Sequence, residues 1–268
     1  MLALREMTSA DIDASIRIID SHDEDDAEEA KGFYERYGVA NQYTLTLDDT
    51  PIGVTGIKQV DGCDKTYWLS WTYIDDEHCG NGYGRKMLKD ILDELANRNA
   101  RKVFLKVSDY IDPEDGDIYG AARHLYQAMG FSTEITLADF YEKGETQFIM
   151  GLRLEQSSDT SELDLNLPDI IDVTAPVKFN NLFEIAETEG SFCFGWEVSG
   201  KQHFTPIDVQ IGLDAAKEQG ARSAYVTFPS NFSAVSGPLE IAKFQLAGTL
   251  NDYYEDGIHE WHFVHHIQ

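Results

Sequence analysis

The chain has 268 residues, of which 42% are hydrophobic and 12% aromatic, so it can build a core and is not a disordered chain. Its formal charge of −27 disfavours nucleic-acid binding and attracts cationic substrates, although the same charge is also typical of a very soluble protein. The sequence lacks a signal-peptide pattern and an apolar run long enough to cross a membrane, and its three cysteines cannot all pair, so we expect a cytoplasmic protein.

Mixed strand and helix patterns fill the first part of the chain and indicate an α/β or α+β domain with a mixed sheet. The predicted strands are Gln42–Leu47, 52–60, Thr66–Ile74, 102–107 and 147–154. The helix faces are Met87, Leu88, Ile91, Leu92 and Leu95, then Ala121, Ala122, Leu125 and Tyr126. The polar stretch 156–167 precedes Pro168 and is interpreted as a linker between domains 1–155 and 168–268.

A glycine-rich loop separates a predicted strand from a predicted helix. The strand 66–74 runs through an acidic turn into Cys79, Gly80, Asn81, Gly82, Tyr83 and Gly84, and Arg85 opens the helix. Glycines let backbone N–H groups crowd around an anion, and a helix N-terminus adds unpaired donors and its dipole. The segment lacks the Gly-Lys-Ser/Thr of a Walker loop and the third glycine of a dinucleotide fingerprint. It therefore predicts a binding site for another phosphate or pyrophosphate group.

The Gly82-Tyr83-Gly84 loop resembles the pyrophosphate loop of the GNAT family of N-acetyltransferases, although Cys79 stands where the family usually has Gln or Arg. The segment LYQAMGF, 125–131, resembles the family's late helix, which ends in Tyr-x-x-x-Gly-Phe. The resemblance covers roughly residues 3–154. It implies a GNAT fold, acetyl-CoA as cosubstrate, and cofactor contacts from Tyr73, Ile74, Cys79, Gly80, Asn81, Gly82, Tyr83, Gly84 and Arg85.

The resemblance also implies a mechanism, namely direct transfer of the acetyl group to a primary amine. Tyr126 would protonate the departing CoA thiolate, and backbone N–H groups near Tyr73 and Ile74 would polarise the thioester. A base must first deprotonate the amine. Glu77 is our candidate among Asp75, Asp76, Glu77 and His78, all of which also fit a solvated loop. The family often has Asn seven residues before the tyrosine, where this chain has Tyr119.

Charge is distributed unevenly along the first domain. Residues 85–106 carry seven basic and three acidic side chains, which suits the phosphates of CoA or an ordinary solvated helix face. The acidic segment 21–38 lies where the resemblance places the helices over the acceptor site, so its acids either select a cationic acceptor or form a soluble helix face.

Three pairs of segments recur in the same order and predict a duplicated fold. They are 92–107 with 213–228, 126–130 with 244–248, and 135–145 with 248–258. The second copy lacks the Gly-x-Gly loop near 200–205 and the basic excess, and Phe244 stands for Tyr126. We therefore expect 168–268 to be a shorter, degenerate, non-catalytic GNAT-like domain.

Two other functions stay open. One is a non-catalytic acyl-CoA-binding module. The other is a protein-interaction module that uses Phe192, Phe194 and Trp196, residues that equally fit a core strand. We expect no metal site, because strand alternation separates His262 and His266 from His259 and His265. The expected partners are a small-molecule or peptide amine, with no nucleic acid and no membrane, and a homodimer is an open possibility.

Overall fold

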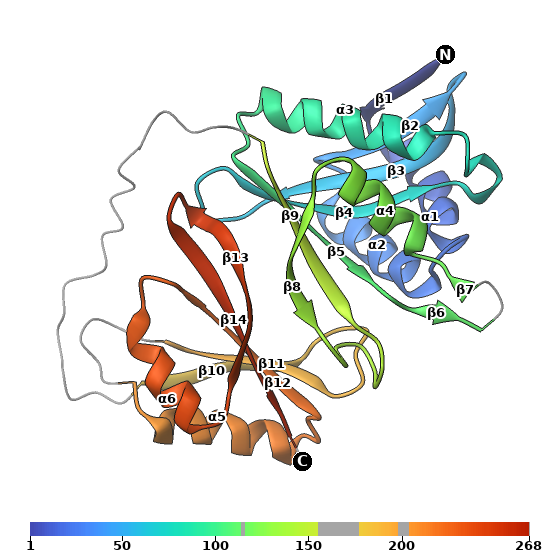
Figure 1. Cartoon of the computed structure of the whole chain (residues 1–268). Coiled ribbons are helices and arrows are strands. Elements are labelled where there is room, and N and C mark those ends of the chain that lie inside the picture. The colour runs from blue at the N-terminus through green and yellow to red at the C-terminus, as the bar shows by residue number, and fades with distance from the viewer. Residues whose placement is uncertain (114–115, 155–176, 198–203, 268) are drawn as a thin grey trace. The chain divides into compact units, whose positions relative to one another are not determined.

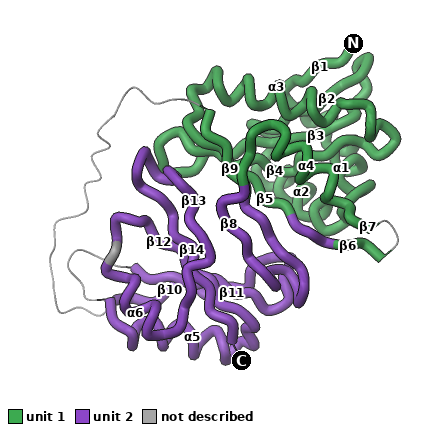
Figure 2. Tube along the Cα trace, viewed as in Figure 1, with its two compact units in different colours: residues 1–107, 111–132, 150–157 green, residues 108–110, 133–149, 158–268 purple. Residues whose placement is uncertain are grey.

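A computed structural model describes residues 1–113, 116–154, 177–197 and 204–267. The chain forms two compact units, which are coloured separately in Figure 2. Unit 1 comprises residues 1–107, 111–132 and 150–157, and unit 2 comprises residues 108–110, 133–149 and 158–268. The predicted linker 156–167 and most of the counterpart of the glycine loop, 200–203, lie outside the described residues. Among the described helices, none is long and apolar enough to cross a membrane.

Unit 1 combines a mixed sheet with four helices (Figure 1). The strand order is β1-β2-β3-β4-β5-β9, in which β1 to β4 are antiparallel neighbours and β4 is parallel to β5. The strands are β1 (Leu2–Glu6), β2 (Gln42–Leu47), β3 (Thr50–Gln59), β4 (Thr66–Ile74), β5 (Lys102–Ser108) and β9 (Gln147–Arg153), of which residues 150–153 of β9 and 102–107 of β5 belong to unit 1. The helices are α1 (Ile12–Asp20), α2 (Glu24–Tyr37), α3 (Tyr83–Asn97) and α4 (Gly120–Ala128). Short pieces complete it: η1 (Ser9–Asp11), η2 (Asp76–His78), and the ladder of β6 (Ile111–Asp112) with β7 (Gly116–Asp117).

The helices begin and bury their faces as the sequence pattern predicts. The Asp23 carboxylate caps α2 by accepting a hydrogen bond from the Asp26 N–H at 2.9 Å, and three acids in the first turn favour the helix dipole. In α3, the predicted apolar face holds the buried residues Met87, Leu88, Ile91 and Leu95. Burying each such side chain contributes about 1.5–3 kcal/mol, which fixes α3 against the sheet.

The β4 strand carries the irregularities that matter for function. Its register against β3 shifts between Val54 and Gly56, so Trp71 and Thr72 form a bulge, and Trp71 has a positive φ of 41°. Its parallel pairing with β5 covers residues 66–68 against 102–104, although β4 continues to residue 74 and β5 to residue 108. The two strands therefore separate at their C-terminal halves, which frees backbone groups of β4 beyond the bulge.

The end of β4 contributes to two different hydrophobic clusters of unit 1. Tyr73 and Trp71 pack against the cluster formed mainly by α1 and α2, which includes Ile19. Ile74 packs with Met87 of α3 in the second cluster. Successive side chains of a strand point to opposite faces, so Tyr73 faces α1 and α2 while Ile74 faces α3.

Unit 2 carries further parallel and antiparallel strands and two helices (Figure 1). Its strand order is β8-β13-β14-β12-β11-β10, in which β11 and β12 are parallel and the other registered pairs are antiparallel. The strands are β8 (Ser132–Leu137), β10 (Lys178–Glu184), β11 (Ser191–Glu197), β12 (Ser223–Pro229), β13 (Gln245–Glu255) and β14 (Ile258–His266). The helices are α5 (Pro206–Glu218) and α6 (Ser236–Ile241), with η3 (Ser233–Val235) before α6.

The core of unit 2 is rich in aromatic residues. It contains the three aromatic residues that a protein-interaction module would use. Phe192 and Phe194 are buried in β11, and Trp196 packs on the same cluster, stacked on Phe228 at 5.9 Å. These side chains therefore pack in the core of unit 2. They do not offer the exposed aromatic surface that the interaction-module hypothesis needs. Phe244, the counterpart of Tyr126 in the repeat, is also buried in this core.

The hairpin residues 133–149 belong to unit 2 by their contacts. Gly248 of β13 pairs directly with Ile135 of β8, and a Cβ at Gly248 would lie 2.9 Å from the Ile135 side chain. The Arg222 guanidinium donates to the carbonyls of Asp139 at 2.5 Å and Glu189 at 2.9 Å. The domain boundary predicted from the sequence, after residue 155, lies beyond this hairpin. Pairing between strands that are distant in the sequence leaves no signal in local composition, so the composition could not show that the hairpin packs with unit 2.

Candidate active site

The glycine loop has left-handed backbone at two positions directly before helix α3. Gly80 and Gly82 have φ values of 76° and 79°, and Gly82 is the N-cap residue of α3. A side chain would strain both positions, which explains the glycines. The first N–H groups of a helix, here those of Gly82, Tyr83, Gly84 and Arg85, have no intrahelical acceptor and carry the positive end of the dipole.

The predicted cofactor residues come together around this helix start. The Asn81 side chain donates to the carbonyls of His78 and Cys79, both at 3.1 Å, and so closes the loop on itself. A Cβ on Gly84 would lie 3.4 Å from Leu125 of α4 and 3.7 Å from Ile74 of β4. The start of α3, the start of the loop and the end of β4 therefore form one locality, in which Arg85 is exposed.

Several bases of the predicted basic patch, residues 85–106, are engaged in contacts within the protein. Lys86, Lys89 and Arg98 pair with acids one helical turn away, at Asp90, Asp93 and Glu94. Arg101 and Lys102 are buried. The Arg101 guanidinium donates to the Asp64 carbonyl and the Thr66 hydroxyl, and the Lys102 ammonium lies over the Phe104 ring. The i,i+4 spacing favours helical ion pairs, so three bases bind the three acids of the segment, and the excess of basic side chains stays as counted from the sequence.

Tyr126 lies buried at α4, with 7% of its surface exposed, and shares a hydrogen bond with the Thr72 hydroxyl at the β4 bulge. Burial raises the pKa of Tyr126 to about 12, with the Thr72 hydrogen bond opposing that shift. The phenol therefore keeps its proton at neutral pH and can act only as a proton donor there. Its ring packs edge-on against Phe131, at 5.8 Å between ring centroids.

A network of acids and tyrosines that the sequence analysis did not assign lies on the α2 side of β4. The Tyr73 hydroxyl donates to Asp26 at 2.5 Å, and the Tyr119 hydroxyl donates to Asp23. Burial, together with the neighbouring charges of Asp23, Glu29 and Asp25, raises the pKa of Asp26 to about 6, and the Tyr73 hydrogen bond opposes this shift. Burial likewise raises the pKa values of Tyr73 and Tyr119.

The missed residues had a weak signal in the sequence. Asp23 and Asp26 belong to the acidic segment 21–38. Nothing in the sequence of that segment shows which of its acids point toward the protein interior. Tyr119 occupies the position where the resemblance expected Asn, and it is the N-cap residue of α4. Glu77, the base predicted from sequence, lies exposed in η2, where its own N–H donates to Asp75 at 3.1 Å.

Cys79 begins the loop and its thiol lies 3.7 Å from the Ile74 carbonyl. Burial raises the pKa of the Cys79 thiol, and the charges of Asp76 and Asp75 raise it further. The thiol is therefore protonated at neutral pH and is a poor nucleophile.

Comparison with known proteins finds a family similarity in the first half of the chain. The model of the "Acetyltransferase (GNAT) family" matches residues 12–131, so this segment is similar to that family. A comparison with curated proteins found no match.

Solved structures share the fold of this domain. A proposed GNAT acetyltransferase from Desulfovibrio desulfuricans is 21% identical, with 58% of this chain and 100% of that chain covered and a TM-score of 0.51. The ribosomal-protein-S18-alanine N-acetyltransferase from Escherichia coli is 20% identical, with 59% and 97% covered and a TM-score of 0.50. A proposed acetyltransferase from Salmonella typhimurium, solved with its cofactor acetyl-CoA, is 18% identical, with 59% and 96% covered and a TM-score of 0.47.

Proposed function

We propose that unit 1 transfers an acetyl group from acetyl-CoA to a primary amine. The observation that carries this proposal is the conjunction at β4: a bulge at residues 71–72, a parallel partner strand that separates beyond residue 68, and a glycine-started helix beside the strand end. Together they offer free backbone donors for a thioester oxygen and an anion site one loop away. The family match over residues 12–131 supports the same chemistry.

The donor would bind through backbone rather than through basic side chains. The pyrophosphate of acetyl-CoA fits the N–H groups of Gly82, Gly84 and Arg85 at the start of α3, and no acid occupies the first turn of this helix. Cys79, Gly80, Asn81 and Tyr83 shape the loop. The thioester carbonyl would then accept hydrogen bonds from the β4 backbone near Tyr73 and Ile74.

The amine must lose a proton before it attacks, and Asp26 suits that task better than Glu77. An acid with a pKa of about 6 is ionised at pH 7 and is more basic than an ordinary aspartate. Asp26 reaches the strand end through the Tyr73 hydroxyl. Glu77 is exposed and keeps its carboxylate in water. Asp26, together with Asp23, also gives this side of β4 the charge that would attract a cationic acceptor.

The leaving thiolate would take its proton from Tyr126. Thr72 and Tyr73 are neighbours in β4, and they hydrogen-bond to Tyr126 of α4 and Asp26 of α2, respectively. The proton acceptor and the proton donor therefore flank the strand from the α2 side and from the α4 side. Acyl transfer has this requirement, because the amine enters and the thiolate leaves on different sides of the carbonyl.

The direct test is acetyl transfer by the full chain, measured as release of free CoA with a panel of amines that includes spermidine, an aminoglycoside and a lysine peptide. We expect turnover with at least one cationic amine and a decrease of about 100-fold in Asp26→Asn, with Glu77→Gln near the wild type. Binding of acetyl-CoA without turnover on any amine would favour the acyl-CoA-binding module instead.

We also propose that residues 177–267 descend from a duplicated GNAT-like fold that lost its site. The order β10-β11-β12-β14, with an antiparallel and then a parallel pair, repeats the order β3-β4-β5-β9 of unit 1. Helix α5 connects β11 to β12, as α3 follows β4 and precedes β5. Phe244 in place of Tyr126 leaves this copy without a proton donor, which supports a non-catalytic role.

A further inference from the structure

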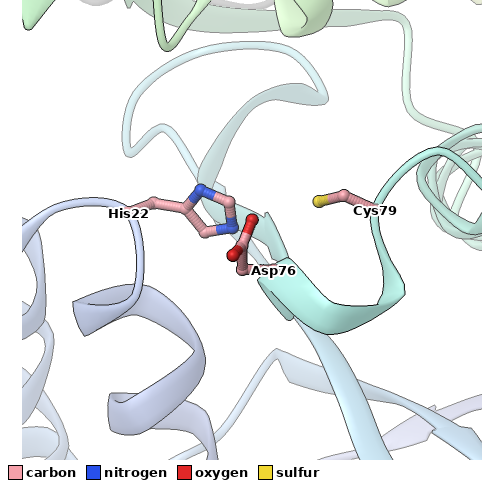
Figure 3. A group of neighbouring side chains, drawn as sticks. All are labelled: His22, Asp76 and Cys79. Atoms are coloured by element: carbon pink, nitrogen blue, oxygen red, sulfur yellow. The ribbon is translucent and has the colours of Figure 1, made fainter. Parts of the chain in front are cut away.

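We propose that His22, Asp76 and Cys79 form a binding site for a thiophilic divalent cation of the Zn²⁺ type. One potential ligand atom from each residue lies within 4.8 Å of the other two. Figure 3 shows the imidazole ring, the carboxylate and the thiol directed toward a common space between the turn that carries His22 and the loop that carries the other two. All three residues belong to unit 1, so the site lies within one compact body.

The fold holds the His22 ring in place from two sides. Its Nε2 lies 2.7 Å from the Ile74 carbonyl oxygen, which can only accept, so Nε2 carries the proton in the metal-free protein. The ring also stacks on Tyr73, at 5.7 Å between centroids and 27° between planes. Coordination through Nε2 replaces the hydrogen bond to Ile74, so the Tyr73 ring is the contact that keeps the imidazole oriented when the metal is bound. A ligand that is oriented before the metal arrives loses less conformational entropy on binding.

Asp76 and Cys79 are presented together by the η2 turn. The Cys79 N–H donates to the Asp76 carbonyl at 3.1 Å, which fixes the spacing of the two residues on one side of the turn. The Cys79 thiol and the His22 Nε2 both lie near the same atom, the Ile74 oxygen, at 3.7 Å and 2.7 Å. That carbonyl oxygen therefore lies beside the proposed cation and could serve as a fourth ligand atom.

The donor set selects the kind of cation. Imidazole, thiolate and carboxylate together favour Zn²⁺ and its borderline neighbours, whereas Mg²⁺ and Ca²⁺ take oxygen ligands. In a tetrahedral zinc site the ligands lie about 2.0–2.3 Å from the metal and hence about 3.3–3.8 Å from one another. The present groups need to close by roughly 1 Å, which suits the exposed side chains of Asp76 and Cys79.

Binding follows a balanced exchange. The cation enters as an aqua ion, the Cys79 thiol loses its proton to solvent, and the neutral imidazole shifts its proton to Nδ1 so that Nε2 can coordinate. The acids around the turn, Asp75, Asp76 and Glu77, add negative charge that attracts the cation. The bound ion would join the turn between α1 and α2 to the first residue of the glycine loop. The proposal concerns metal binding alone and does not rest on acetyl transfer.

The test is a titration of the metal-free full chain with Zn²⁺ in competition with a chromophoric chelator, paired with the absorption spectrum of the Co²⁺ form. We expect one Zn²⁺ per chain and, with Co²⁺, a near-ultraviolet thiolate charge-transfer band plus visible bands of a tetrahedral site. Cys79→Ser and His22→Gln should each weaken Zn²⁺ binding at least tenfold, and Cys79→Ser should remove the charge-transfer band.

Cys63→Ser is the matched control, because Cys63 is a cysteine of the same unit outside the proposed ligand set. It should change the affinity by less than twofold. The proposal is overturned if the wild type binds no stoichiometric Zn²⁺, if its Co²⁺ form lacks the thiolate band, or if the Cys63 variant loses binding instead. The wild-type spectrum decides the matter even when a ligand variant fails to fold.

Discussion

Replacing Tyr126 by Phe separates the structural role of this residue from its proposed chemical role. The change removes one hydroxyl that hydrogen-bonds to Thr72 and leaves the ring packed on Phe131. Loss of one such hydrogen bond costs about 1 kcal/mol of stability. That corresponds to a decrease in Tm of about 2–4 °C for a protein of this size.

The kinetic effect should be much larger than the stability effect. A positioned general acid contributes about 100-fold or more, so Tyr126→Phe should lower kcat by at least that factor. The KM for acetyl-CoA should stay within about threefold, because the phosphates bind at the start of α3. Initial rates of CoA release with the best amine substrate measure both constants.

The matched control is Phe131→Leu, which should lower the stability by a similar amount because it reduces a buried ring contact but keeps the hydroxyl. Its kcat should stay near the wild type. The assignment of Tyr126 as the acid is refuted if Tyr126→Phe and Phe131→Leu lower Tm alike and leave kcat alike.

Three further predictions follow from single contacts. Asp26 must be ionised to accept a proton and has a pKa of about 6, so kcat/KM should rise as the pH rises through about 6. Asp26→Asn should lack this rise in kcat/KM, and a rise that persists unchanged in the variant would show that another group is the base. Gly82→Ala places a side chain at a φ of 79° and should weaken acetyl-CoA binding in calorimetry by about 5- to 30-fold through a penalty of about 1–2 kcal/mol, whereas Gly38→Ala, with a φ of 75° and equally open space, should leave the affinity intact; equal losses in both would contradict the loop assignment. Arg222→Leu removes a donor from four carbonyl oxygens, of which those of Phe140 and Tyr141 keep a second donor, and should cost about 2–4 kcal/mol in urea unfolding, while Lys217→Met should cost less than about 0.5 kcal/mol; similar values for both would show that the Arg222 contacts do not stabilise the fold.

The sequence predicted the elements with strong periodicity well. Strands β2 and β4 have the predicted bounds, and β5 and β9 differ by one residue at their ends. Helix α3 extends four residues before the first predicted apolar position, because its start is set by Gly82 as N-cap rather than by apolar spacing. Gly80 and Gly82 of the predicted glycine loop have positive φ values, which glycine adopts without strain.

Long-range relations were beyond the sequence pattern. The partners of Asp26 and His22 lie about 50 positions away in the chain, at Tyr73 and Ile74. No local spacing encodes such contacts, which arise when α1 and α2 pack on β3 and β4. Similarly, composition counted Arg101 and Lys102 as ligand charges, but burial depends on which strands pair beside them.

The site residues named from the resemblance are a prediction that binding and kinetics must test. The structure brings Ile74, Gly84 and the helix carrying Tyr126 into one locality, and it puts Glu77 in water. The partners expected from composition, namely a cationic amine and no nucleic acid, rest on charge and stay predictions as well.

The measurement that tests the central claim most directly is a calorimetric titration of the full-length chain with acetyl-CoA. We expect one site per chain, lost or weakened in Gly82→Ala and retained in Tyr126→Phe. Two sites per chain would contradict a degenerate second copy, and the absence of binding at millimolar acetyl-CoA would contradict the acetyltransferase proposal itself.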